Sequence, residues 1–415
     1  MSLPSQSSSG LLHQRPFVLF WTGRVASSMA YQMLALVIGW QVYELTNSAF
    51  DLGLVGLIQF VPAVGLTLLV GHAADRYDRR LLIRGAQSVY VLAALMITVA
   101  TLTGLLSRNL LFVAVFLIGC GRIFEATTMS ALVPALVPPP LISRAVAAWT
   151  SANQTAIICG PALGGLIYAV QPVLVTALCV AFFATAITLI SLVRPRETSD
   201  AREPPTFSSV LDGFHYIFTR HRLLGVVTLD LFVVLLGGVT ALLPIYARDI
   251  LEVGPIGLGL LRSAPAAGAL MTAIVLSRHP IERHIGHKMF AVVAIYGLAT
   301  VVFGISTWFP LSLLALAVLG ASDAVSIVVR FSLVQIETPD AMRGRVSAIN
   351  YLFVGSSNTL GDFRAGVNAE GFGAVASVLI GGIGSLLVAA IWMLIFPDLR
   401  RIDRYQPPEQ DSART

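Results

Sequence analysis

Six charged residues lie deep inside apolar stretches of the chain, where they could exchange protons or bind an ion. They are three arginines and three acids: Arg24, Arg122, Glu125, Asp230, Asp323 and Arg330. A charge inside a hydrocarbon layer is costly, so such residues are expected to face a bundle interior or a wet cavity. Burial raises the pKa of any carboxylate and a neighbouring arginine lowers it, so movement can bind or release a proton. The set predicts a charge-balanced cavity with proton-exchanging acids.

The spacing of these acids ranks them as proton carriers. Glu125 lies one turn from Arg122, which could keep it permanently ionised. Asp323 lies seven residues from Arg330, about 10 Å along a helix axis and too far for a direct bond. Asp230 has no charged neighbour in its own stretch. We therefore favour Asp323 and Asp230 as the titrating pair, with Glu125 as the third candidate; a structural ion pair is the alternative for each.

The stretches that carry these charges are long enough to cross a membrane. Of the 415 residues, 56% are hydrophobic and 12% are charged, about half the charged fraction of a soluble protein. Runs of about 20 apolar residues span a roughly 30 Å hydrocarbon layer as helices, whereas barrel strands need only about ten alternating residues. Twelve transmembrane helices are predicted: 17–43, 51–70, 84–105, 110–133, 146–169, 173–193, 223–246, 256–276, 289–306, 310–334, 346–367 and 372–396.

The deep charges fall in the first, fourth, seventh and tenth predicted helices, which suggests three-helix units whose first members line a central cavity. Arg262, Asp362 and Arg364 lie in other helices and are expected near the outer surface, where long side chains can reach water. Among the remaining Lys and Arg residues, twenty fall on one side of the predicted spans and only Arg108 and Arg248 on the other. The positive-inside rule then places both termini in the cytoplasm.

A polar, proline-containing break at 194–222 divides the chain. It predicts an N-terminal six-helix bundle at 1–193, a cytoplasmic linker with an interfacial helix at 194–222, a C-terminal six-helix bundle at 223–396 and a cytoplasmic tail at 397–415. Residues 132–165 and 333–366 align without a gap and share seven identities. Internal repeats of this kind are typical of transporters built from duplicated halves.

Two short motifs sit at ends or bends of the predicted helices. Residues 71–80, GHAADRYDRR, place five charges between two apolar runs. Residues 159–165, CGPALGG, would interrupt a helical hydrogen-bond ladder at Pro161 and present a smooth face through Gly160, Gly164 and Gly165. The histidine-rich HPIERHIGH at 279–287 falls in a predicted positive loop, so we expect a solvated loop there and no metal site.

Over essentially its whole length the chain resembles the major facilitator superfamily. The match to the superfamily's loop signature G-x-x-x-D-R-x-G-R-R is made by Gly71, Asp75, Arg76, Arg79 and Arg80, with Asp78 in place of the glycine. CGPALGG resembles the core of the helix-five antiporter motif. Residues 43–57 and 338–363 are similar to the branch of drug efflux and enterobactin (siderophore) exporters. The resemblance implies two pseudo-symmetric six-helix bundles.

The resemblance also implies roles for these motifs. Asp75 would pair with an arginine of a neighbouring helix end, with Arg343 and Arg345 as candidates, and hold the cytoplasmic side shut in one state. A purely topological role is the alternative for the arginines. The glycines and proline of CGPALGG would form a pivot and seal, or simply a close packing face.

Polar residues of 346–367 lie within about a third of the helix circumference, among them Asn350, Tyr351 and Asn358, and Gln32 shares a face with Arg24. They form either a wall of the substrate path or interhelical hydrogen bonds.

Together these features predict a proton-coupled antiporter of the bacterial inner membrane that exports a small drug-like or siderophore-like molecule by alternating access. No nucleotide-binding or nucleophile motif is present, so we expect no enzyme activity and no cofactor. The expected partners are the small-molecule substrate, protons and the lipid bilayer, with no nucleic acid, and the chain is expected to act as a monomer. A proton symporter that imports a nutrient is the alternative within transport, and a non-transporting membrane sensor is the alternative from another class.

Overall fold

The computed structural model describes residues 10–76, 78–193 and 207–405. Contacts group the chain into two compact units, which are described separately: unit 1 comprises Met1–Gln41 and Ile58–Pro204, and unit 2 comprises Val42–Leu57 and Pro205–Thr415. The end of the first long helix and the start of the second therefore belong to unit 2. The domain boundaries expected from the sequence stay a prediction.

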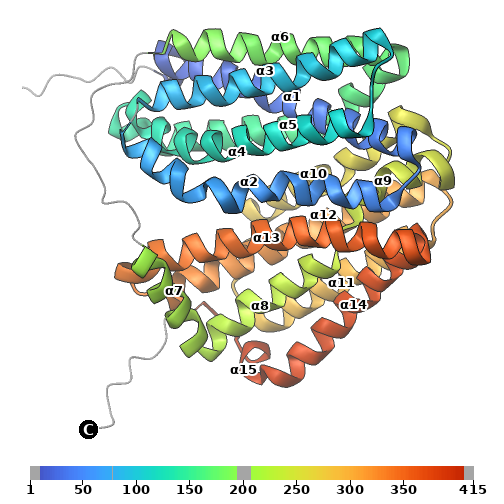
Figure 1. The fold of residues 1–415 in the computed structure, drawn as a ribbon. Helices are drawn as coiled ribbons and strands as arrows, with labels where there is room; N and C mark the ends of the chain where they lie inside the picture. Colours follow the sequence, from blue (N-terminus) through green and yellow to red (C-terminus); the bar gives the residue numbers. More distant parts are fainter. Residues whose placement is uncertain (1–9, 77, 194–206, 406–415) are drawn as a thin grey trace, which may run out of the picture. The chain divides into compact units, whose positions relative to one another are not determined.

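Unit 1 is built from long helices joined by short turns (Figure 1). They are α1 (Arg15–Thr46), α2 (Ala49–Arg76), α3 (Arg79–Thr103), α4 (Arg108–Leu136), α5 (Ile142–Val170) and α6 (Pro172–Ser191). Helix α3 packs against both α4 and α6, and the fully buried rings of Tyr90 and Phe183 meet at 5.1 Å in this core. Short 3-10 turns lie at Leu11–His13 and Pro139–Leu141.

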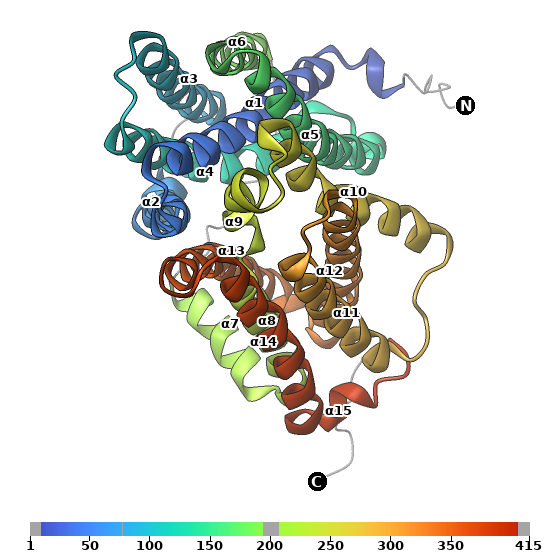
Figure 2. The ribbon, with the colours of Figure 1, turned by 90° about the vertical axis from the view of Figure 1, so that its right-hand side faces the viewer.

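Unit 2 contains the remaining helices (Figure 2). They are α7 (Phe207–Thr219), α8 (His221–Leu236), α9 (Val239–Ile245), a π-helical turn η3 (Tyr246–Ile250), α10 (Gly254–Arg278), α11 (Ile285–Ile305), α12 (Phe309–Glu337), α13 (Asp340–Phe372), α14 (Ala374–Ile395) and α15 (Pro397–Arg400). Helix α12 packs against α10 and α11, and α11 packs against α14.

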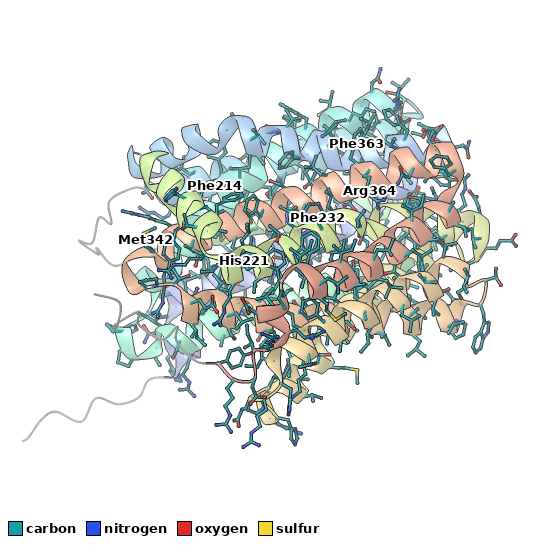
Figure 3. All side chains as sticks on the ribbon, turned by 90° about the horizontal axis from the view of Figure 1, so that it is seen from below. Phe214, His221, Phe232, Met342, Phe363 and Arg364 are labelled. Atoms are coloured by element: carbon teal, nitrogen blue, oxygen red, sulfur yellow. The ribbon has the colours of Figure 1, made fainter. Side chains whose placement is uncertain are left out.

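The short helix α7 and the start of α8 cover one end of this unit (Figure 3). The Phe214 ring of α7 meets Phe353 of α13 edge-on at 5.5 Å. His221, the first residue of α8, lies 4.6 Å from the Phe396 ring. Further along α8, Phe232 lies 5.1 Å from Trp392 of α14. Aromatic contacts thus fix α7 and α8 against α13 and α14.

The helix predicted at 223–246 is wrong as a single element. Helix α8 ends at Leu236 with Gly237 as its C-cap, and Gly238 adopts a left-handed conformation with φ of 71° before α9 begins. Two glycines in succession leave the backbone free to break, because Gly238 has no Cβ to clash at positive φ. Pro244 lies inside the seven-residue α9, and the π-helical turn follows. The Gly237–Gly238 pair was the visible signal for this break.

Nine helices among the described residues are long and apolar enough to cross a membrane, by length and composition. One of these spans, His221–Ile250, runs through the break after α8. The other predicted spans correspond to α4, α5 and α13, which contain 29, 29 and 33 residues. The expected all-α membrane fold is confirmed, and each of the predicted spans corresponds to a long helix or, once, to a broken one.

Candidate functional site

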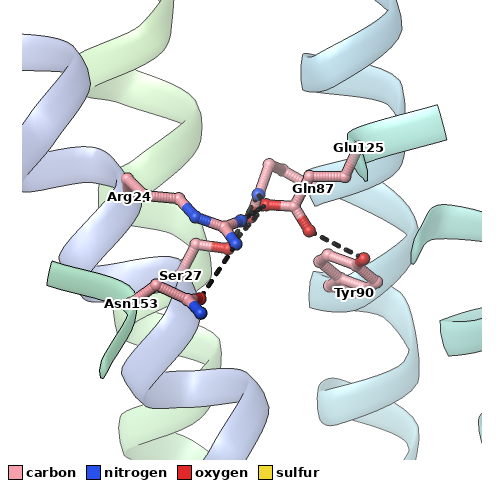
Figure 4. A network of polar contacts seen from close by, with 6 residues as sticks. All are labelled: Arg24, Ser27, Gln87, Tyr90, Glu125 and Asn153. Carbon is pink, nitrogen blue, oxygen red and sulfur yellow. Dashed lines mark hydrogen bonds and ion pairs between the residues drawn. The ribbon is translucent and has the colours of Figure 1, made fainter. Parts of the chain in front are cut away.

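A buried carboxylate joins four helices at the centre of unit 1 (Figure 4). Glu125 Oε1 on α4 pairs with Arg24 Nη1 of α1 at 2.8 Å. The same oxygen accepts a hydrogen bond from Gln87 Nε2 of α3 at 2.9 Å, and Oε2 accepts one from the Tyr90 hydroxyl at 2.9 Å. Arg24 Nη2 donates to Asn153 Oδ1 on α5 at 3.2 Å. Both carboxylate oxygens are therefore bonded.

Ser27 completes this network, which we call the Glu125 network. Its hydroxyl donates to Glu125 Oε1 at 3.3 Å and accepts from Gln87 Nε2 at 2.8 Å. The side chains of Arg24 and Glu125 are 18% and 9% exposed, so water contributes little. A buried carboxylate is stable when several donors and a positive partner compensate its charge. The Glu125 network supplies both.

Arg122 binds a tyrosine in place of the acid expected from the sequence. Its Nη1 donates to the Tyr31 hydroxyl, and the guanidinium carbon lies 5.0 Å from the Tyr31 ring centre. Gln59 Nε2 donates to the same hydroxyl at 3.2 Å. The ion-pair partner of Glu125 is Arg24, 101 residues away in sequence, so the one-turn spacing did not identify it. Arg24 and Glu125 cancel, which leaves Arg122 as the excess positive charge of this site.

In unit 2, Asp230 of α8 and Arg330 of α12 form a buried ion pair between Oδ2 and Nη1. Their side chains are 6% and 8% exposed. Asp323 lies two turns before Arg330 on α12, half-buried and close enough to interact electrostatically with both members of the pair. Within the described part of the chain, its carboxylate makes no hydrogen bond or ion pair. Two acids thus share one arginine.

The deep charges outside these two clusters hold backbone and neighbouring helices in unit 2. Arg364 of α13 donates from Nε to Leu235 O at 3.0 Å, and from Nη2 to Leu236 O at 2.6 Å and Gly237 O at 3.0 Å. These carbonyls end α8 and have no helical partner, so the arginine caps the break. Asp362 lies within electrostatic reach of Arg262. We expected these side chains to extend toward the outer surface; Arg364 instead binds the broken helix end.

Sequence reasoning missed a cluster in unit 2 between the end of α1 and the turn η3, which we call the Arg248 cluster. Arg248 Nε pairs with Asp249 Oδ1 at 2.7 Å, and its guanidinium carbon lies 4.1 Å from the Tyr43 ring centre. Arg248 Nη2 donates to Asn47 Oδ1 at 2.5 Å, and the Tyr43 hydroxyl donates to Asp249. Asn47 has a positive φ of 51°, which asparagine tolerates better than most residues.

A second set of contacts in unit 2 joins the start of α2 to α13. Glu370 Oε2 accepts from the Ser48 hydroxyl and from the Phe50 backbone N–H, both at 3.0 Å. Gly53 and Gly366 bring the two backbones together: a Cβ on Gly53 would lie 2.9 Å from the Phe363 carbonyl oxygen. A larger residue at this crossing would push α2 away from α13.

The signature motif lies mainly in helix, whereas the sequence suggested a loop over 71–80. Helix α2 continues to Arg76 and α3 begins at Arg79. Asp78 caps α3: its carboxylate accepts from Arg80 N at 2.8 Å and pairs with Arg80 Nη2 at 2.8 Å. The Arg80 side chain keeps the Asp78 pKa below its ordinary value. The residue that departs from the signature is therefore a helix cap.

The other gating candidates are only partly placed. The structure does not describe the side-chain surroundings of four of them: Gly71, Asp75, Arg76 and Arg79. The suggested pairing of Asp75 therefore lies outside what is described. In unit 2, the Arg343 Nε donates to Gln335 O at 3.1 Å, and Arg345 lies 3.5 Å from the Met342 sulfur.

The helix-five motif forms a close contact with α1. A Cβ on Gly160 would lie 2.6 Å from Gln32 Cβ, and one on Gly164 would lie 3.2 Å from Met33 Cα. Pro161 and Gly165 are buried beside them. The smooth face predicted from CGPALGG packs against α1, and its role as a pivot stays a prediction.

The expected polar wall of α13 is only partly placed. Asn358 Nδ2 donates to Val354 O of its own helix at 2.9 Å, and Asn350 is half-buried. The Tyr351 side chain is not among those that the structure describes. Their place in a substrate path remains a prediction.

Long apolar helices with ion pairs buried between them are the features of a multi-pass membrane protein. The chain matches the family described as transmembrane secretion effector over residues 6–411. It belongs to that family, within the major facilitator superfamily.

Relatives and solved structures agree with this assignment. The enterobactin exporter EntS of Citrobacter koseri is 29% identical over 420 residues, with 97% of both chains covered, and that of Escherichia coli is 28% identical over 418 residues, with the same coverage. The nucleoside transporter NupG has a similar fold, with a TM-score of 0.73 at 14% identity over 92% of this chain and 99% of that one. A bacterial homologue of the iron transporter ferroportin matches with a TM-score of 0.72 at 15% identity, covering 95% and 100%.

Proposed function

We propose that this protein exports a small organic molecule across the inner membrane by proton antiport, with both termini in the cytoplasm. The observation that carries the proposal is Asp323, a half-buried acid without a bonded partner beside the Asp230–Arg330 pair. The relatives named as enterobactin exporters support the export direction. The protein acts as a monomer in this proposal.

Charge balance explains why this cluster suits proton coupling. One arginine can neutralise one of two carboxylates, and a second unpaired charge inside an apolar bundle is costly. A proton on either acid restores neutrality at low cost. Because Arg330 is within electrostatic reach of both Asp230 and Asp323, loss of the proton from one acid would redirect the arginine and alter the contact between α8 and α12.

The substrate class follows from the excess positive charge in unit 1. Arg122 is exposed and lies against the face of Tyr31, which orients the guanidinium while leaving donors for a ligand. An anionic, planar group such as a catecholate fits a cation beside an aromatic ring. The relatives are named as exporters of enterobactin, and a siderophore-like anion is the substrate we propose.

Alternating access would involve the contacts that join the α1–α2 connection to η3 and α13. The Arg248 cluster and the Gly53–Gly366 crossing would hold this end shut in one state and separate in the other. Exposed ion pairs and hydrogen bonds of this type contribute only about 1 kcal/mol each, so they can break during a transport cycle.

Purified protein in liposomes tests the coupling. Wild type should concentrate a catecholate siderophore against its gradient when a pH gradient is imposed, and Asp323→Asn should bind it but fail to concentrate it. Asp398→Asn, a change at an exposed acid of α15, serves as the matched control and should pump normally. Uphill transport by Asp323→Asn at the wild-type rate would exclude this acid as the proton carrier, and transport only down the gradient by wild type would exclude antiport itself.

A second measurement tests the substrate site. Arg122→Gln should weaken binding of an anionic catecholate by about tenfold, or 1.4 kcal/mol, since a charge-assisted hydrogen bond is lost, and should leave binding of a neutral analogue unchanged. Equal losses for both ligands would contradict a role for Arg122 in anion recognition.

A further inference from the structure

Unit 1 has an apolar groove that none of the charged residues described above lines. The groove has a volume of about 280 Å³ and is lined by α1, α5 and α6, with Met29, Leu163, Ile167 and Phe182 among its residues. Leu163 is 43% exposed, so the groove opens outward. None of the residues that line it belongs to the Glu125 network.

The polar atoms at the groove are already bonded within the protein. Trp21 Nε1 donates to Ala148 O at 3.0 Å, and the Thr22 hydroxyl donates to Val18 O at 2.8 Å. A ligand in the groove would therefore meet hydrocarbon surface without competing for a hydrogen bond. This selects an alkyl chain over a polar molecule.

A second cavity, of about 390 Å³, lies at the start of α1 and the end of α6 and is lined by Arg15, Leu19, Ser191 and Leu192 with Pro16. Arg15 is exposed and is the charged member of this lining. Helices α1 and α6 thus offer a cationic, polar site at one end and an apolar groove further along.

The two cavities follow one stripe of α1. Arg15, Leu19, Thr22, Ala26, Met29 and Met33 recur every three or four residues, which places them on one helix face. From Thr22 to Met33 the helix rises by about 16 Å at 1.5 Å per residue. That is about half of a roughly 30 Å hydrocarbon layer, the depth that one acyl chain occupies.

We propose that this stripe binds an anionic phospholipid of the surrounding bilayer, in the leaflet at the N-terminal end of α1. The phosphate group contacts Arg15, and one acyl chain fills the groove between α1, α5 and α6. The charge complementarity of Arg15 with a phosphate, followed by one leaflet's depth of hydrocarbon surface, favours a phospholipid over the transported molecule. A cation near the membrane surface strengthens anionic lipid binding by about fivefold.

Native mass spectrometry of protein released from nanodiscs tests the site. Wild type should retain phosphatidylglycerol about fivefold more than phosphatidylcholine, and Arg15→Gln should remove this preference. Arg144→Gln, a change at an exposed arginine at the start of α5 in the same unit, is the matched control and should keep it. Ala26→Phe, which fills the groove, should reduce retention of both lipids.

The result that would overturn the proposal is an unchanged phosphatidylglycerol preference in Arg15→Gln. Equal retention of both lipids by wild type would also overturn it, because the groove would then hold bulk lipid without selection. Displacement of the lipid by the transported catecholate at equal concentration would assign the groove to the substrate. A circular dichroism spectrum identical to that of wild type would show that each variant is folded.

Discussion

Two acids inside the long helices of this protein, the buried Glu125 in unit 1 and the half-buried Asp323 in unit 2, differ in how they are bonded. Glu125 accepts hydrogen bonds from four side chains on two helices, α1 and α3. Asp323 has no bonded partner in the described residues and shares its surroundings with an arginine already paired to Asp230. The same residue class in the same kind of helix therefore has four bonded partners in one unit and none among the described residues of the other.

In the function proposed above, this difference assigns a structural role to Glu125 and the coupling role to Asp323. A charge with several donors is held in one state, because protonating it would break bonds that have no other partner. A charge with none can gain a proton without disrupting its neighbours. We therefore expect bonded partners, and not burial alone, to decide which acid can exchange a proton.

The strongest test of the comparison is stability. Glu125→Ala leaves Arg24 buried without its ion-pair partner and frees Gln87 and Tyr90 of theirs, so it should lower the free energy of unfolding by about 3–5 kcal/mol. Asp323→Ala removes no bond of the described structure and should cost less than about 1 kcal/mol. Thermal unfolding in detergent, followed by the loss of the far-ultraviolet circular dichroism signal, measures both.

The paired variant Arg24→Met, Glu125→Met is the control. It removes both charges together, so it should be more stable than Glu125→Ala alone. A double variant that is less stable than the single one would show that packing, and not the unpaired charge, dominates.

The Asp230–Arg330 pair sharpens the comparison within unit 2. Asp230→Asn leaves Arg330 buried without a bonded negative partner, unless Asp323 moves to it. If Asp323 replaces Asp230 as the partner of Arg330, Asp230→Asn should lower the free energy of unfolding by about 1–2 kcal/mol. The double variant Asp230→Asn, Asp323→Asn should then lower it by about 3 kcal/mol or more. Chemical denaturation of the three variants measures this coupling; additive losses would show that Asp323 does not reach Arg330.

The cap on the broken helix should have a smaller effect. Arg364→Gln removes hydrogen bonds from the guanidinium to the carbonyls of Leu235, Leu236 and Gly237, which should cost about 1–2 kcal/mol. In Arg364→Gln, hydrogen exchange in α9 should be faster than in wild type. Exchange in α11, whose backbone Arg364 does not cap, should be unchanged. Arg364→Lys should restore part of the protection, and equal exchange rates in wild type and Arg364→Gln would exclude a role for the cap.

The smallest effect should be at the cap of α3. The pKa of Asp78 is lowered by Arg80, so its contribution is present above the ordinary carboxyl pKa of about 3.9 and is lost as the pH falls through the lower folded value. Asp78→Ala should lower the free energy of unfolding by about 1 kcal/mol at pH 7 and by almost nothing at a pH below the lowered pKa of Asp78. Unfolding at both values, with Asp398→Ala as the exposed control, checks this; a pH-independent cost would contradict the ionised cap.

The two clusters also show which signals a sequence carries. The sequence was enough to locate the deep charges, since any charge among about 20 apolar residues stands out. It did not identify their partners, because Arg24 and Glu125 lie 101 residues apart. The left-handed break after α8 was visible as Gly237–Gly238, but the arginine that caps it lies on another helix.

The sequence by itself determined the long apolar helices, their membrane class and the family resemblance, because these depend on local composition and on spacing along the chain. It also located the charged and glycine positions of the candidate site. Only the tertiary structure decided that Arg24 binds Glu125, that Asp230 binds Arg330, that Asp323 stays without a bond and that Arg248 meets Tyr43. Side chains distant in sequence find partners only when helices pack, and the low dielectric between them makes that choice of partner decide which charges are fixed.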